Sequence, residues 1–318
     1  MKYTLLFCLS ICILNVNAQS KKKIIVAQDG SGNYTTVQAA IDAVPAGNAS
    51  PVEIFIKKGV YKEMVNLPAG KDNVTMTGED KDKTIITFNN HTGGNLPNGT
   101  PGSTYNSATF FIYANNFSAS NITVINDAGF SAGQAVGIFA SGDKLRFNNC
   151  RITGFQDILF CSGNNSRQYY KNCYIEGTTD FIFGPSTCVF QSCEMHSKKN
   201  SHVTAASTPA TSAYGFVFFD CKLTADTGLH GVDLGRPWRP TASVTYIRCN
   251  IGDHILPVGW NNWGNPANEA TARFAEYKST GPGANPEGRV KWAKQLTKEE
   301  ADKITLAAIF GNWDPTKS

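Results

Sequence analysis

The stretch Phe147-Asn148-Asn149-Cys150-Arg151-Ile152 decides the fold, because its spacing of aromatic, cysteine and aliphatic residues returns four more times. The cysteines of the five copies stand at positions 150, 173, 193, 221 and 249, which are 23, 20, 28 and 28 residues apart. A looser copy precedes them with serine in the cysteine position, Phe117-x-x-Ser120-x-Ile122. The full copies are Phe147-x-x-Cys150-x-Ile152, Tyr170-x-x-Cys173-x-Ile175, Phe190-x-x-Cys193-x-Met195, Phe218-x-x-Cys221-x-Leu223 and Tyr246-x-x-Cys249-x-Ile251.

The alternation within each copy is that of a short β-strand. A repeat of this length with one such strand per turn is typical of a parallel β-helix, in which like residues stack on like. The cysteines then form an internal ladder of small buried side chains. Neighbouring rungs about 4.8 Å apart would allow a disulfide, but parallel side chains do not converge as a disulfide requires. We therefore predict mostly free thiols, with disulfides as the alternative.

The rest of the chain supplies the two ends of this rod. Thr35-x-x-Gln38 resembles a capping box and predicts a helix that ends before Pro45. Thr297-x-x-Glu300 predicts a second helix, continuing through Ile309. No linker or shift in composition divides residues 19–318. The predicted fold is all-β: a single-domain parallel β-helix with short capping helices at its N- and C-terminal ends.

Residues 1–18 have the pattern of a secretory signal peptide. Lys2 supplies the positive end, Leu5 to Leu14 the apolar run, and Val16-Asn17-Ala18 a small-residue cleavage pattern. The run is too short to span a bilayer, so we expect an exported protein, secreted or periplasmic, without a membrane span. The sequence has no Lys/Arg-rich run, which argues against nucleic acid as a partner. Its net charge of +4 would suit an anionic substrate. We expect a monomer.

Polar residues that stand within apolar runs of the sequence show a second regular spacing. Gln134, Asp157 and Asp180 are 23 residues apart, the spacing of the first two full copies, which predicts that they and Gln156 share one face. Arg236 falls on the same face. An arginine beside one Asp keeps it ionised, while burial beside a like charge favours protonation of the other. Such a pair can supply a nucleophile and a general acid, and amides can stabilise an oxyanion. Turn capping and a stabilising ion pair are the alternative.

Four motifs in order resemble the signature set of the pectin methylesterase family. The resemblance covers essentially the whole of residues 19–318, with further matches at Gly59-x-Tyr61-x-Glu63, at Phe274-Ala275-Glu276-Tyr277 and at Gly281-Pro282-Gly283-Ala284. The four motifs are Gln134-Ala135-Val136, Gly154-Phe155-Gln156-Asp157, Asp180-Phe181-Ile182-Phe183-Gly184 and Leu234-Gly235-Arg236-Pro237-Trp238.

This resemblance implies a right-handed parallel β-helix that hydrolyses the methyl esters of galacturonate in pectin and needs neither metal nor cofactor. It implies that Asp180 is the nucleophile and that Asp157 is the general acid and then the base. Gln134 and Gln156 would be the oxyanion donors. Arg236 would hold the nucleophile.

The resemblance also implies aromatic contacts with the sugar. Phe183 and Trp238 match family binding positions, and we add Trp260 and Trp263 as aromatic residues of the same groove. Each of the four could instead pack in the core. The chain departs from the family beside the acid, with Ile158 and Phe160 where Thr and Tyr are usual.

Other functions remain open at this point. A non-catalytic carbohydrate-binding β-helix, or an esterase acting on a different acylated polysaccharide, would share much of the pattern. Gly129-Phe130-Ser131-Ala132-Gly133 matches the serine-esterase motif, but that motif needs a strand–turn–helix context. A lyase or a galacturonase of the same fold would not explain the two glutamines. No His/Cys set has the spacing of metal ligands.

Overall fold

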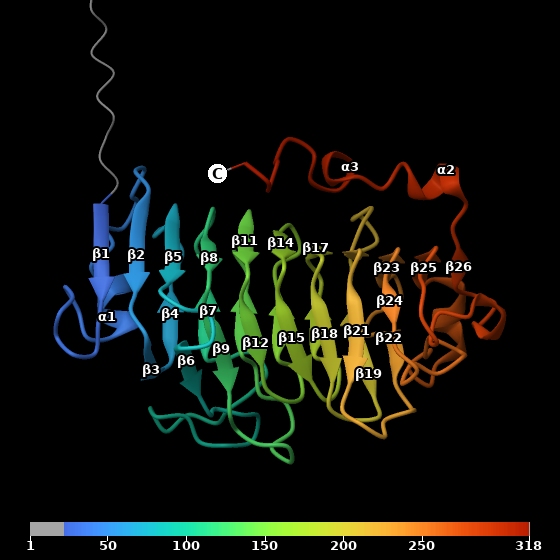
Figure 1. Cartoon of the computed structure of the whole chain (residues 1–318), viewed down its shortest axis with the longest axis horizontal. Helices are drawn as coiled ribbons and strands as arrows, with labels where there is room; N and C mark the ends of the chain where they lie inside the picture. Colours follow the sequence, from blue (N-terminus) through green and yellow to red (C-terminus); the bar gives the residue numbers. More distant parts are fainter. Residues whose placement is uncertain (1–21, 318) are drawn as a thin grey trace, which may run out of the picture.

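The computed structural model describes residues 22–317, and the predicted signal peptide at 1–18 lies outside them. Within this range three parallel sheets run side by side along one elongated body (Figure 1). Sheet A has 11 strands, in the order β1 (Lys22–Val26), β2 (Val52–Ile56), β5 (Val74–Gly78), β8 (Ser118–Ser120), β11 (Leu145–Asn148), β14 (Arg167–Lys171), β17 (Thr187–Gln191), β20 (Phe216–Phe219), β23 (Ser243–Ile247), β25 (Arg273–Tyr277) and β26 (Lys294–Gln295).

Sheets B and C complete each turn of the chain, which visits A, then B, then C. Sheet B has the order β24 (Asn250–Ile251), β21 (Lys222–Ala225), β18 (Glu194–Ser197), β15 (Tyr174–Gly177), β12 (Arg151–Thr153), β9 (Thr123–Asn126), β6 (Thr84–Phe88) and β3 (Gly59–Lys62). Sheet C has the order β22 (Asp233–Pro237), β19 (His202–Ala206), β16 (Ile182–Gly184), β13 (Leu159–Cys161), β10 (Ile138–Ala140), β7 (Phe110–Ile112) and β4 (Val65–Leu67). The predicted all-β, right-handed parallel β-helix is confirmed.

The aromatic residues of the repeat stack inside the rod, in register from strand to strand of sheet A. Successive rings lie 4.4 to 4.8 Å apart and within 4 to 11° of parallel. The five repeat cysteines are buried free thiols in one column, as predicted. Offset-stacked rings gain more than their burial alone supplies, so the repeat builds the core directly.

The predicted register of the looser copy, which begins at Phe117, is wrong by two residues. Ala119 pairs with Phe147 across β8 and β11, so Ile122 takes the place of the cysteine. In each copy a bend follows the sheet A strand and separates the aromatic residue from the cysteine position. One residue of this bend adopts a left-handed backbone with φ of 51 to 55°. Asn and Asp tolerate that conformation best. The bend residues are Asn121, Asn149, Asn172, Ser192, Asp220 and Arg248.

Short helices lie at both ends. Helix α1 (Val37–Asp42) buries Val37, Ala40 and Ile41, and its N-cap is Thr36 rather than Thr35. The capping box of Thr297 and Glu300 is confirmed, but it opens only α2 (Lys298–Ala301). The chain then turns and Thr305 caps a separate helix, α3 (Leu306–Phe310), so the predicted continuous helix is wrong. Two 3-10 turns, η1 (Pro266–Ala270) and η2 (Pro286–Gly288), precede them.

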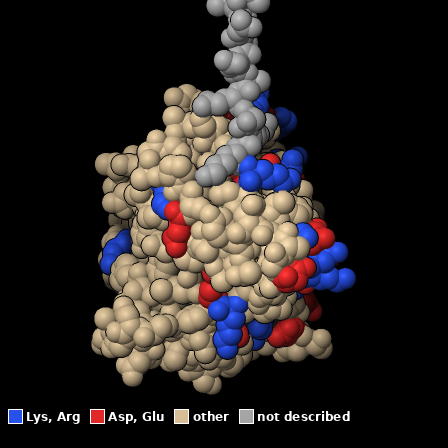
Figure 2. Space-filling model, turned by 90° about the vertical axis from the view of Figure 1, so that its left-hand side faces the viewer, with Lys and Arg blue, Asp and Glu red and all other residues tan. Residues whose placement is uncertain are grey.

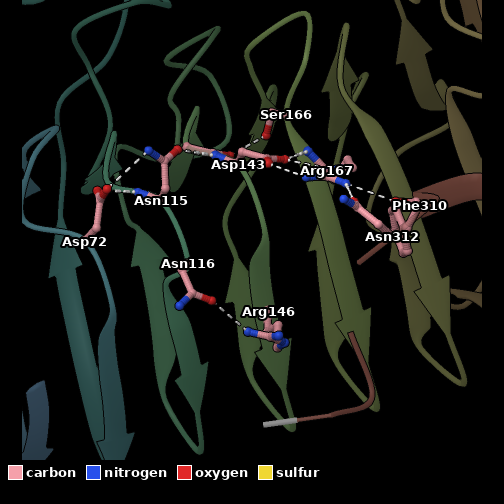
Figure 3. Close-up of polar contacts among 10 residues, drawn as sticks. Asp72, Asn115, Asn116, Asp143, Arg146, Ser166, Arg167, Phe310 and Asn312 are labelled. Atoms are coloured by element: carbon pink, nitrogen blue, oxygen red, sulfur yellow. Dashed lines mark hydrogen bonds and ion pairs between the residues drawn. The ribbon is translucent and has the colours of Figure 1, made fainter. Parts of the chain in front are cut away.

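The C-terminal arm, residues 306–317, runs back along the outside of sheet A (Figure 1). Phe310 and Trp313 pack on apolar side chains of this sheet. Arg167 joins the arm to the rod, since it pairs with Asp143 at 2.6 Å and donates to the Phe310 carbonyl at 3.0 Å (Figure 3). Arg146 donates to the Pro315 carbonyl at 3.3 Å. The arm therefore covers part of sheet A and leaves sheet C uncovered.

The N-terminal end of the rod carries basic and acidic side chains side by side (Figure 2). Lys23 pairs with Glu53 at 3.5 Å, and Lys58 with Glu79 at 3.9 Å. Because the two signs are mixed, this face offers no single-sign surface for a polyanion.

Candidate active site

The outer face of sheet C carries a row of side chains in strict register. Phe111, Phe139, Phe160 and Phe183 occupy equivalent positions on β7, β10, β13 and β16. The row continues through Ala205 on β19 to Arg236 on β22. Phe160 stacks on Phe183 at 4.3 Å. The outer face of sheet C thus carries a row of aromatic rings, followed by the small Ala205 and the cationic Arg236.

The two aspartates stand at equivalent positions on successive turns. Asp157 and Asp180 each precede by two residues a register pair, Leu159 with Ile182. Both have a left-handed backbone, with φ of 62 and 49°, a conformation that Asp adopts more readily than most residues. The amide of Asp180 donates to the His202 carbonyl at 2.8 Å, which fixes it to the next turn. The 23-residue spacing therefore predicted their proximity correctly.

The two glutamines form a second such pair. Gln134 and Gln156 face each other in an isolated parallel bridge, one residue before the aspartate position. Neither carboxamide has a hydrogen-bond partner among residues 22–317, and both line the same pocket. Two amide donors are thus free to bind an oxygen of a ligand.

All five predicted catalytic residues line one pocket of about 250 Å³. Phe183, Trp238 and Trp263 line it as well. Thr104 and Tyr105 also line it, and no motif had singled them out. They come from the long Gly/Asn/Thr-rich loop that follows β6, and the Tyr105 ring lies 5.8 Å from Phe160. An aromatic residue in an otherwise polar loop was the only sequence signal for this wall.

The two carboxyls of the pocket differ in their hydrogen-bond partners and in their electrostatic surroundings. Arg236 binds Asp180 through two hydrogen bonds, Nε to Oδ1 at 3.0 Å and Nη2 to Oδ2 at 2.6 Å. Asp157 has no hydrogen-bond partner for its carboxyl within the described chain. Burial, and secondarily the charge of Asp180, raise the pKa of Asp157 well above its ordinary value, while Arg236 opposes this. Asp157 therefore keeps its proton to higher pH than an ordinary Asp.

Trp260 was wrongly predicted to face the substrate. Its side chain is 2% exposed and stacks on Phe274 at 4.4 Å inside the rod. Its indole N–H donates to Glu276 Oε1 at 3.1 Å. A buried indole needs such a partner, so Trp260 is a core residue. Ile158 is also fully buried, in the core beneath the aspartates.

The serine-esterase alternative lacks its structural context. Ser131 is exposed in a turn and does not line the pocket. The next element after it is strand β10, not a helix. Across residues 22–317 no group of three or more His, Cys, Asp or Glu side chains could hold a metal ion. The same residues include no helix long and apolar enough to cross a bilayer.

A parallel β-helix with an open pocket on one sheet, lined by carboxyls, amides and aromatic rings, is an architecture suited to an enzyme acting on an extended polymer. A family model for pectinesterases matches residues 23–312. Pectinesterase 31 of Arabidopsis thaliana is 38% identical over 287 residues, 88% of this chain and 89% of the relative. The chain belongs to the pectinesterase family, and it is a carboxylic ester hydrolase.

Further relatives agree with this placement. A pectinesterase/pectinesterase inhibitor of Brassica campestris is 39% identical over 91% of this chain, which spans about half (51%) of that protein. The solved pectin methylesterase from carrot superimposes with a TM-score of 0.83 at 34% identity, covering 92% of this chain and 94% of its own. A pectin methylesterase solved in complex with a hexasaccharide gives 0.83 at 28% identity, covering 94% and 100%.

Proposed function

We propose that this chain removes methyl esters from methylated polygalacturonate, releasing methanol, with Asp180 as nucleophile and Asp157 as general acid and base. One observation carries the assignment of roles: of two carboxyls at equivalent positions, Arg236 pairs only with Asp180. The unpaired Asp157 has the raised pKa that suits a proton donor. The names of the relatives support the substrate.

In the first step an oxygen of Asp180 bonds to the ester carbonyl carbon. The carbonyl oxygen gains negative charge, and the free amides of Gln134 and Gln156 donate to it. The bond to the methoxy oxygen then breaks, and Asp157 gives that oxygen its proton. Methanol leaves, and the galacturonyl group remains joined to Asp180 as an anhydride.

In the second step Asp157, now a carboxylate, accepts a proton from water. The hydroxide oxygen bonds to the galacturonyl carbonyl carbon, and the bond to Asp180 breaks. The products are a free carboxylic acid on the polymer unit, which loses its proton to solvent, and a site with Asp157 protonated and Asp180 ionised as at the start. Because the chain's own groups complete the reaction, we propose that it uses neither metal nor cofactor.

The walls of the pocket suit a sugar polymer. Phe183 and Trp238 offer ring surface to the apolar faces of sugars, and Trp263 lines the pocket beside Arg236. Each cleavage exposes a carboxylate, and the net charge of +4 is compatible with that polyanion. We propose export of a monomer, directed by residues 1–18.

Methanol release from highly methylated pectin tests the substrate. We expect release from methylated pectin, none from fully de-esterified polygalacturonate, and no acetate from an acetylated xylan. Acetate release without methanol would instead support an esterase for a different polysaccharide. Binding of pectin with no release of methanol would support the non-catalytic carbohydrate-binding alternative.

A further inference from the structure

Trp263 lies flat on the guanidinium group that holds Asp180. The Cζ atom of Arg236 is 3.7 Å from the indole ring centre, the shortest cation–ring contact within residues 22–317. The edge of the guanidinium is already occupied, since Nε and Nη2 both donate to Asp180. Trp263 therefore covers a face that the carboxylate does not use, and it restricts the rotation of the arginine side chain.

The backbone at Trp263 is strained. Its φ is +62°, a left-handed conformation that bulky L residues rarely adopt and that glycine adopts without steric cost. The side chain of Asn261 stabilises the turn by accepting the Trp263 amide at 2.7 Å. Asn262 does the same for the amide of Gly264 at 2.9 Å. The turn thus holds the Trp263 ring against Arg236 although its backbone conformation disfavours a large side chain.

The turn is also anchored to the rod on both sides of Trp260. The Leu234 amide donates to the Gly259 carbonyl at 2.7 Å, and the Asn261 amide to the Gly235 carbonyl at 3.1 Å. These bonds attach the turn to β22 directly beside Arg236. Beneath it, Trp260 is buried and bonded to Glu276. Trp263 is thus a rigidly placed ring and not a side chain at the tip of a free loop.

We propose that Trp263 is a positioning residue, whose stacking on Arg236 fixes the plane of the guanidinium and thereby the attacking carboxylate of Asp180. This rests on the proposed function, because it acts through Asp180 as nucleophile. It differs from a role as sugar platform: one indole face is taken by the guanidinium. A platform contributes to binding and appears in KM, whereas a positioning residue contributes to the chemical step and appears in kcat.

Three substitutions separate these roles. In Trp263→Leu, apolar bulk remains without a π face, and we expect kcat to fall about tenfold, equivalent to about 1.4 kcal/mol, with KM little changed. Trp263→Phe keeps a ring and should restore most of kcat. Trp263→Gly should lower kcat as Leu does without lowering the unfolding temperature, because it relieves the backbone strain. Val258→Ala, an exposed change in the same turn, is the control.

A raised KM with unchanged kcat in the Leu variant would overturn the inference in favour of a sugar platform. Equal kcat values for Trp263→Leu and Trp263→Phe would also overturn it. So would a lower kcat of Trp263→Gly that is accompanied by a lower unfolding temperature. Asp180→Asn is measured in parallel. Full activity of Asp180→Asn would refute the proposed function itself, whereas an inactive Asp180→Asn beside a fully active Trp263→Leu would refute only this inference.

Discussion

Asp157 and Asp180 occupy equivalent positions on successive turns of the rod, and Arg236 forms hydrogen bonds with only Asp180. Two chemically identical side chains thereby acquire different environments, and this asymmetry is the basis of the proposed roles. The row of sheet C explains how the asymmetry arises. The small Ala205 stands between Phe183 and Arg236 and leaves room for the arginine to reach Asp180.

The pH profile should report Asp157. Its pKa is raised, chiefly by burial and then by the charge of Asp180, and the proposed acid must be protonated to donate. We therefore expect kcat/KM to fall as the pH rises through this raised pKa. In Asp157→Asn, activity should drop about 10²- to 10⁴-fold, and the residual activity should lose that limb. An unchanged limb in the variant would assign it to another group.

Asp157 should also cost stability at neutral pH. A carboxyl with a raised pKa in the folded state binds its proton more tightly than in the unfolded chain. The contribution of Asp157 to stability is therefore most favourable at low pH and is lost as the pH rises from the ordinary value of 3.8 through the folded pKa. Asp157→Asn carries no charge, so we expect a higher unfolding temperature than wild type at pH 7 and little difference near pH 3. A lower unfolding temperature at pH 7 would contradict the raised pKa.

The oxyanion donors give a third prediction. Gln134→Ala and Gln156→Ala should each lower kcat about 10²- to 10³-fold with a smaller effect on KM, because the donated bonds strengthen as charge develops on the oxygen. Gln295→Ala, at an exposed position of β26, is the matched control and should retain full activity. Loss confined to KM would place the glutamines in substrate binding alone.

The C-terminal end of the rod contains a buried ion pair. Arg289 binds Glu276 through Nε at 2.8 Å, with side chains 2% and 4% exposed. Glu276→Ala leaves that arginine uncompensated and should lower the free energy of unfolding by about 3–5 kcal/mol in denaturant titrations. The exposed Glu299→Ala should stay within about 0.5 kcal/mol of wild type. A similar small effect in both variants would show that the pair adds little.

The repeat and the aspartate spacing could be predicted from sequence because a parallel β-helix converts spacing along the chain into stacking in space. That conversion fails where a strand has two candidate positions on the same face, as at Phe117, which lies two residues before Ala119, the true partner of Phe147. Phe117 still contacts the Phe147 ring at 5.9 Å, so its aromatic character could not distinguish the two registers. The two tryptophans of Trp260-Asn261-Asn262-Trp263 show a further limit. Only one enters the core, and the left-handed turn that directs the other outward has no signature beyond its asparagines. Tyr105 reaches the pocket through a long loop whose path depends on tertiary contacts.

The most direct test compares initial rates of methanol release from highly methylated pectin by wild type, Asp180→Asn, Asp157→Asn and Ser131→Ala. The account predicts that Ser131→Ala matches wild type, that Asp157→Asn keeps a small residual rate, and that Asp180→Asn loses about 10⁴-fold or more, with circular dichroism confirming that each variant is folded. Wild-type release by folded Asp180→Asn, or release lost only in Ser131→Ala, would contradict it.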